Sequence, residues 1–105
     1  MGVRVYKFGG ASLGDLDKVK AAAQFLKDEK QSHGQAIIVI VSAMGDTTDH
    51  LTALAHKVSA NPRKRELDML LTAGERISMS LMSLCLNEIG VSAVSFTGSQ
   101  AGIIT

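Results

Sequence analysis

The pattern of apolar and polar residues alternates between short β-type runs and longer helical segments. Residues 3–8 and 91–96 are rich in β-forming side chains, and residues 36–41 form an unbroken apolar run. Such a continuous run is typical of a strand that is covered on both faces in a parallel sheet. The pattern therefore predicts three strands at these positions.

Three helices are expected between the strands, because apolar residues there recur at helical spacing. The first covers about residues 15–30, with Asp15 as a suitable N-cap. The second follows a polar loop at 42–48 and ends at an Asn-Pro dipeptide. The third covers about residues 63–90 and contains Gly74, which indicates either close packing or a break in the helix.

The order strand, helix, strand, helix, helix, strand predicts an α/β fold, namely a three-layer α/β/α sandwich with a mainly parallel sheet. Loops rich in glycine and hydroxyl residues follow each strand, at 9–14, 42–48 and 97–102. Parallel strands place such loops at one edge of the sheet, where ligands bind. Because three strands make a thin sheet, we expect the fold to be incomplete.

The first of these loops has the features of a phosphate site. A strand that ends near Lys7 leads through the loop into a helix that begins near Asp15. A Walker A loop is excluded because Asp15 and Leu16 follow Gly14, and a dinucleotide fingerprint is excluded because Ala11 replaces its middle glycine. The motif therefore indicates a third kind of phosphate site. Its candidate phosphate-binding residues are Lys7, Gly9, Gly10 and Ser12.

Composition narrows the class of protein. The chain has 105 residues, 46% of them apolar, and a net charge of +1 without a basic stripe, so we expect no nucleic-acid partner. No apolar run approaches the roughly 20 residues that span a bilayer, so no membrane partner is expected. The single cysteine, Cys85, excludes an intrachain disulfide and favours the cytoplasm. The three histidines have no ligand spacing, so no protein metal site is expected.

Four segments resemble, in order, the signatures of the amino-acid kinase family, and specifically of its members that phosphorylate L-aspartate. These segments are residues 7–12, 39–49, 65–75 and 95–102. Their order and their span over nearly the whole chain make the resemblance highly specific. It implies transfer of the γ-phosphoryl group of ATP to the side-chain carboxylate of L-aspartate, in amino-acid biosynthesis. It also implies Mg²⁺ as a cofactor with ATP, held mainly by phosphate oxygens.

The resemblance also implies roles for individual residues. Lys7 would contact the transferring phosphoryl group as the catalytic residue, and the loop that follows it would hold the phosphates of ATP. The amino-acid substrate would be held by Ser42, Thr48 and Glu75, with the Glu75 carboxylate facing the substrate ammonium group.

Each of these residues also has an ordinary structural explanation. Lys7 at a strand end could be solvated, and Ser12 could cap the next helix. The hydroxyls of Ser42 and Thr48 could satisfy local backbone groups. Glu75 could pair with its neighbour Arg76 on a helix surface.

By the same resemblance, residues 1–105 are the N-terminal portion of an amino-acid kinase domain. The nucleotide-binding half and the regulatory domains would lie outside this sequence. We therefore expect little activity from this chain alone, and self-association through the open edge of the strand at 91–96. Two alternatives remain open: a kinase of the same family with another substrate, and a non-catalytic lobe that binds ligand or self-associates.

Overall fold

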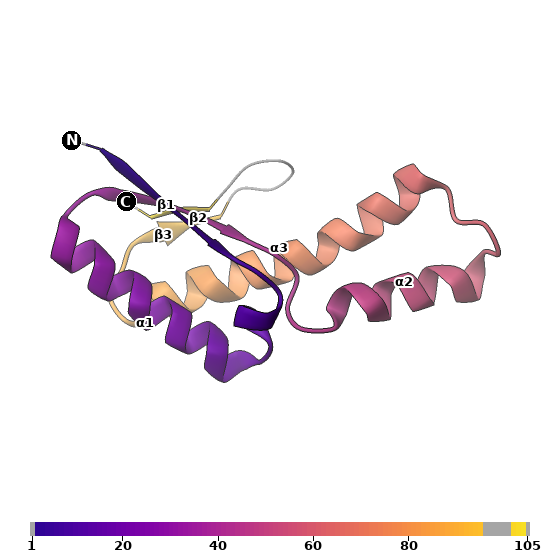
Figure 1. The fold of residues 1–105 in the computed structure, drawn as a ribbon, viewed down its shortest axis with the longest axis horizontal. Helices are drawn as coiled ribbons and strands as arrows, with labels where there is room; N and C mark the ends of the chain where they lie inside the picture. The colour runs from indigo at the N-terminus through magenta and orange to yellow at the C-terminus, as the bar shows by residue number, and fades with distance from the viewer. Residues whose placement is uncertain (1, 96–101, 105) are drawn as a thin grey trace.

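The computed structural model describes residues 2–95 and 102–104 (Figure 1). The order strand, helix, strand, helix, helix, strand is confirmed, with one further strand after it. In chain order the elements are β1 (Val3–Phe8), the 3₁₀ helix η1 (Ala11–Leu13), α1 (Leu16–His33), β2 (Ala36–Val41), α2 (Thr47–Val58), α3 (Lys64–Glu88), β3 (Ala93–Val94) and β4 (Gly102–Ile104).

The four strands form one sheet in the order β1-β2-β4-β3. β1 pairs with β2 in parallel, from Val3 opposite Ala36 to Phe8 opposite Val41. β4 is antiparallel to both β2 and β3, so β1, β2 and β3 run in one direction. The predicted α/β class and mainly parallel sheet are therefore confirmed. The antiparallel strand β4 was not predicted, because Gly102 belongs to the expected loop at 97–102 and no element is expected after it.

The third strand begins later than predicted because Val91 is held against the end of α3. Its backbone N–H donates to the carbonyl of Leu86 at 2.8 Å, and its side chain is buried in the core. The side-chain oxygen of Asn87 then accepts from the backbone N–H of Ala93 at 3.1 Å. These contacts hold residues 91 and 92 in the turn after the helix. β3 begins only at Ala93.

Local chemistry defines both ends of α1. The Asp15 side chain accepts from the backbone N–H of Lys18 at 2.8 Å, which confirms the predicted N-cap. At the other end Gly34 has a φ of 66°, a conformation that favours glycine, and its N–H donates to the carbonyl of Lys30 at 2.8 Å. The helix therefore continues to His33, a little beyond the predicted end.

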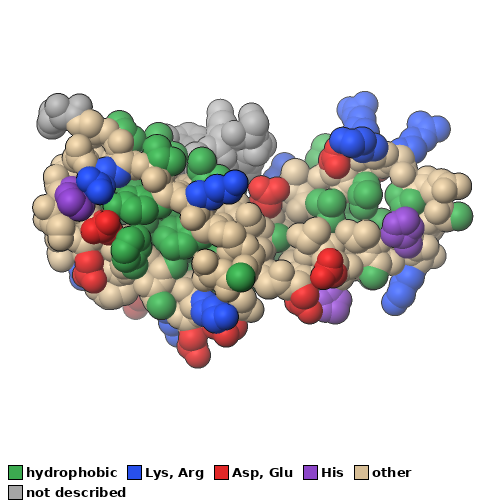
Figure 2. All heavy atoms as spheres, viewed as in Figure 1, with side chains coloured by type: hydrophobic (Ala, Val, Ile, Leu, Met, Phe, Trp, Pro, Cys, Tyr) green, Lys and Arg blue, Asp and Glu red, His purple; other side chains and the backbone are tan. Residues whose placement is uncertain are grey.

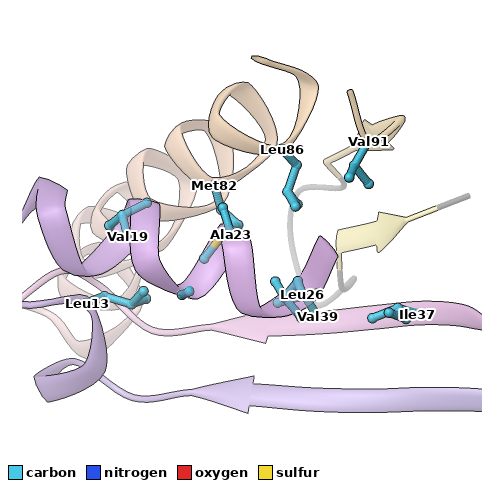
Figure 3. Close-up of a cluster of buried hydrophobic side chains, with 10 residues drawn as sticks. Leu13, Val19, Ala23, Leu26, Ile37, Val39, Met82, Leu86 and Val91 are labelled. Atoms are coloured by element: carbon cyan, nitrogen blue, oxygen red, sulfur yellow. The ribbon is translucent and has the colours of Figure 1, made fainter. Parts of the chain in front are cut away.

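The core lies between the sheet and the two helices α1 and α3, which pack against each other on one face (Figure 3). Leu26 of α1 and Ile37 of β2 are fully buried there. Figure 3 shows Met82 and Leu86 of α3 pointing toward the side chains of α1. Hydrophobic burial of this kind is the main favourable term in folding. The core therefore holds α3 at a defined position beside the sheet.

α3 is continuous from Lys64 to Glu88, so the predicted alternative of a break at Gly74 is wrong. By length and composition alone this helix could also cross a membrane, a test that core helices of α/β proteins also pass. Here it packs against α1, α2 and β3. α2 and the first half of α3 form a hairpin that extends beyond the sheet (Figure 1), and Figure 2 shows hydrophobic side chains gathered over this hairpin.

The other face of the sheet is open in the part of the chain that the structure describes. Val3, Val5 and Ile40 point to this face and are 57%, 59% and 42% exposed. On the opposite face, Tyr6 and Phe8 make edge-to-face contacts with the Phe25 ring of α1. The described residues therefore form two layers of the expected sandwich, and no described helix makes the third.

Candidate functional site

The loops that follow β1 and β2 meet at one edge of the sheet. The backbone N–H of Ser42 donates to the carbonyl of Phe8 at 3.1 Å, which extends the ladder beyond the strands. The N–H of Gly45 then donates to the carbonyl of Gly10 at 3.2 Å. The two loops are thus in direct contact, as the parallel sheet predicts. Most of the third predicted loop, at 97–102, lies outside the described residues.

The glycine loop folds into a single 3₁₀ turn. The N–H groups of Ser12 and Leu13 donate to the carbonyls of Gly9 and Gly10, each at 3.1 Å, and the Leu13 side chain is buried. The amides of Gly9, Gly10 and Ala11 make no backbone hydrogen bond within the described part of the chain. Backbone N–H groups without a backbone acceptor are suitable hydrogen-bond donors for an anion.

Gly9 has no structural reason to be glycine. A Cβ built at this position meets nothing within 4 Å, and its φ lies outside the left-handed region. An alanine would therefore fit the fold without strain. A glycine at such an exposed position permits the close approach of a ligand to the backbone.

The first turn of α1 carries two negative charges. Asp15 caps the helix through its carboxylate, and Asp17 adds a second negative charge in the first turn. These charges offset the partial positive charge of the helix N-terminus. The candidate anion donors are therefore the loop amides and Lys7 rather than α1 itself.

Lys7 and Ser12 are both exposed beside this loop. Lys7 lies two residues before Gly9, on the sheet face opposite to α1, because successive strand residues point to opposite faces. Ser12 lies within η1, and since Asp15 caps α1, the alternative role of Ser12 as the cap of that helix is wrong.

The two predicted hydroxyl residues lie at the two ends of the second loop. Ser42 directly follows β2 and is half-buried, whereas Thr48 is exposed in the first turn of α2. Between them, the N–H of Thr47 donates to the carbonyl of Met44 at 2.9 Å. The backbone carbonyl of Thr48 accepts from the Thr52 hydroxyl at 2.8 Å. The Thr48 hydroxyl makes no hydrogen bond within the described residues.

α3 packs against the second loop at Gly74. A Cβ at Gly74 would lie 3.0 Å from the Ala43 Cβ and 3.1 Å from the Thr47 Cγ2. The predicted close packing at this glycine is therefore confirmed. The next residue, Glu75, is exposed and makes no ion pair with Arg76 or any other described residue. Glu75 therefore directly follows the position at which α3 contacts the loop that carries the two hydroxyls.

Sequence reasoning missed the part played by Gly45. This residue has a φ of 46°, and its backbone lies against Gly14 of the first loop. The only available signal was a glycine directly before Asp46, in a loop that leads into a helix. Backbone amides, an ammonium group, hydroxyls and a carboxylate therefore lie on three segments in contact. Together they could bind one ligand that carries phosphate and another that carries an amino group.

Comparison with known proteins gives one consistent result. A model of the amino acid kinase family matches residues 2–104. The chain is 50% identical over all 105 residues to an aspartokinase of Bacillus sp. (strain MGA3), and 51% identical to aspartokinase 2 of Bacillus subtilis (strain 168). The fold is similar to the crystal structure of aspartate kinase from Synechocystis, with a TM-score of 0.88 and 47% identity.

These matches differ in how much of each protein they cover. The two Bacillus matches include all of this chain, but 25% and 26% of the relatives. The Synechocystis match covers 93% of this chain and 17% of the other. The chain thus spans about a quarter of the length of the curated relatives it matches.

We expect Gly74→Ala to lower the free energy of unfolding by about 1–3 kcal/mol, because the new methyl group would overpack against Ala43 and Thr47. Helix propensity alone predicts the opposite sign, a gain of about 1 kcal/mol. Urea unfolding measures the difference. Ser80→Ala, at an exposed position of the same helix, is the matched control and should not destabilise. A Gly74→Ala protein as stable as the parent would contradict the close-packing argument.

Proposed function

Since this chain belongs to the amino acid kinase family, we propose that it is part of an aspartokinase, which transfers the γ-phosphoryl group of ATP to the side-chain carboxylate of L-aspartate. The observation that carries this proposal is the 50% identity over all 105 residues to the Bacillus enzyme. Because the match covers a quarter of that relative, the activity is proposed for the complete protein. We propose that residues 1–105 are the N-terminal portion of its kinase domain.

We further propose that the complete enzyme works in the cytoplasm. Its product, aspartyl phosphate, would supply the biosynthesis of lysine, threonine and methionine. The single free cysteine is compatible with a reducing compartment.

The glycine loop is the proposed site for the phosphates of ATP. Its unbonded amides at Gly9, Gly10 and Ala11 support this role, as does the open space beside Gly9. Lys7 would neutralise charge on the transferring group, and Ser12 would add a hydroxyl donor. Phosphoryl transfer needs little covalent help from a protein, so positioning and charge neutralisation would supply most of the rate.

Mg²⁺ would accompany ATP in this proposal. Within the described residues no group of three His, Cys, Asp or Glu side chains could hold a metal ion. An ion bound mainly through phosphate oxygens and water fits this donor set, because Mg²⁺ commonly keeps several waters and few protein ligands. The phosphates of ATP would therefore be the main ligands of the metal.

The second loop and α3 are the proposed site for L-aspartate. Ser42 and Thr48 would hydrogen-bond to the substrate from the two ends of the loop, and Glu75 would face its ammonium group. The packing of Gly74 against this loop supports the proximity of Glu75. A carboxylate at this position favours a substrate with a free α-amino group over the alternative acceptors of the family.

We expect Gly9→Ala in the complete enzyme to raise the KM for ATP about 10- to 100-fold, because a methyl group would block hydrogen bonds between loop amides and charged phosphate oxygens. Urea unfolding of the variant should match the parent, since the Cβ meets nothing within 4 Å. Steady-state kinetics with varied ATP measures the first effect. An unchanged KM for ATP would contradict the proposed role of the glycine loop in ATP binding.

Lys7→Ala and Glu75→Ala in the complete enzyme should affect different kinetic constants. Loss of the Lys7 ammonium should lower kcat by about 10²- to 10³-fold, because its interaction strengthens as charge develops in the transition state. Loss of the Glu75 carboxylate should raise the KM for aspartate at least about tenfold, since the substrate ammonium loses its counter-ion. Steady-state kinetics with varied aspartate concentration separates the effect on kcat from the effect on the KM for aspartate.

Matched controls are available at exposed positions of the hairpin. Lys57→Ala and Glu66→Ala remove the same charges away from the two loops and should leave both constants unchanged. If Glu75→Ala keeps the parental KM for aspartate, the assigned role of Glu75 is wrong. If Lys7→Ala raises only KM, Lys7 binds the ground state and is not the catalytic residue.

We also propose that the protein is a homo-oligomer. β3 lies at one edge of the described sheet, where unpaired backbone groups favour association, and apolar residues are exposed on the open face. The net charge of +1 opposes association only weakly. Light scattering of the 105-residue chain over a concentration series should give a mass above that of the monomer. A monomeric mass at every concentration would show that the sheet edge at β3 does not drive association, and it would contradict this argument for a homo-oligomer.

A further inference from the structure

The loops at 9–14 and 42–48 touch each other backbone to backbone. We infer that Gly45 is a positioning residue, which sets the place of the phosphoryl-donor loop relative to the acceptor loop. This inference rests on the proposed function, because that proposal assigns ATP to one loop and aspartate to the other. Gly45 itself would touch neither substrate and would act through the two loops.

The contact is tight for a Cβ at either Gly45 or Gly10. A Cβ at Gly45 would lie 3.0 Å from the Gly14 carbonyl oxygen and 3.6 Å from its Cα. The N–H of Gly45 donates to the Gly10 carbonyl at 3.2 Å. In the other direction, a Cβ at Gly10 would lie 3.3 Å from the carbonyl oxygen of Ala43 and 3.5 Å from that of Gly45. Glycines on both sides therefore bring the two backbones into contact.

A contact between backbones transmits position more directly than a contact between flexible side chains. Backbone atoms in packed loops have no alternative rotamers through which to relax, so a shift of one loop displaces the other. Phosphoryl transfer depends on the relative position of donor and acceptor, and a misplacement of about 1 Å can cost about 10²-fold in rate. A residue that spaces the loops therefore affects kcat without touching a substrate.

A purely conformational role for Gly45 is the competing explanation, because its φ of 46° is strained for any side chain. Two other glycines share this feature without the contact. Gly34 has a φ of 66° and Gly90 a φ of 88°, and a Cβ at either position meets nothing within 4 Å. Replacing them tests backbone strain alone, whereas replacing Gly45 tests strain together with loop spacing.

The experiment compares Gly45→Ala with Gly34→Ala in the complete enzyme. We expect Gly45→Ala to lower kcat for aspartyl phosphate formation about 10- to 100-fold, with the KM for ATP and aspartate within about threefold of the parent. Gly34→Ala should keep the parental kcat. Urea unfolding of both variants measures the shared cost of strain.

A second readout reports misalignment directly. If the acceptor loop is displaced, water can attack the γ-phosphorus in place of the aspartate carboxylate, which releases ADP and inorganic phosphate. The ratio of inorganic phosphate to aspartyl phosphate, trapped as its hydroxamate, should rise in Gly45→Ala and stay parental in Gly34→Ala. A loss of folded protein would lower both products together and leave this ratio unchanged.

Gly10→Ala perturbs the same contact more gently, because its Cβ would need a shift of only a few tenths of an ångström. Because Gly10 also belongs to the proposed phosphate site, the product ratio is the readout for this variant if Gly45→Ala does not fold, and it should rise less than in Gly45→Ala. A parental product ratio in Gly10→Ala, or a parental kcat and product ratio in a folded Gly45→Ala, would overturn the positioning role. A parent enzyme that forms no aspartyl phosphate would instead contradict the proposed function.

Discussion

The parallel pairing of β1 with β2 is the constraint on which the rest of the structure depends. Its register runs from Val3 opposite Ala36 to Phe8 opposite Val41, so both strands end at the same edge. The loops that follow must then share that edge, and they make direct backbone contact there. A shift of one residue would reverse the faces of β1, exposing Tyr6 and Phe8 and burying Lys7.

The core on one side of the sheet determines where α3 lies, and α3 in turn completes the candidate site. Met82 and Leu86 hold the second half of the helix against α1 and the sheet. The first half extends beyond the sheet, where Gly74 lets the helix approach the loop that follows β2. Glu75 therefore owes its place to hydrophobic packing two to three turns further along the same helix.

The apolar residues on the open face bear on the prediction that the strand at 36–41 is covered on both faces. The continuous run at 36–41 predicted a strand covered on both faces. The structure buries Ile37 and Val39 beneath α1 and α3 but leaves Ile40 42% exposed, together with Val3 and Val5 of β1. The apolar run of β2 thus indicates that both faces of the strand are covered. Within the described residues, only one face is. The proposal of a longer kinase domain accounts for the other.

The sequence by itself determined the types of the elements from β1 to β3, the α1 N-cap at Asp15 and the signatures that identify the family, because these depend on local spacing and composition. It also indicated which residues could bind phosphate and an amino acid. Only the tertiary structure decided that β4 enters the sheet between β2 and β3, that α3 remains unbroken at Gly74, and that Gly45 lies against Gly14. These features arise from contacts between segments far apart in the chain, which local propensity does not encode.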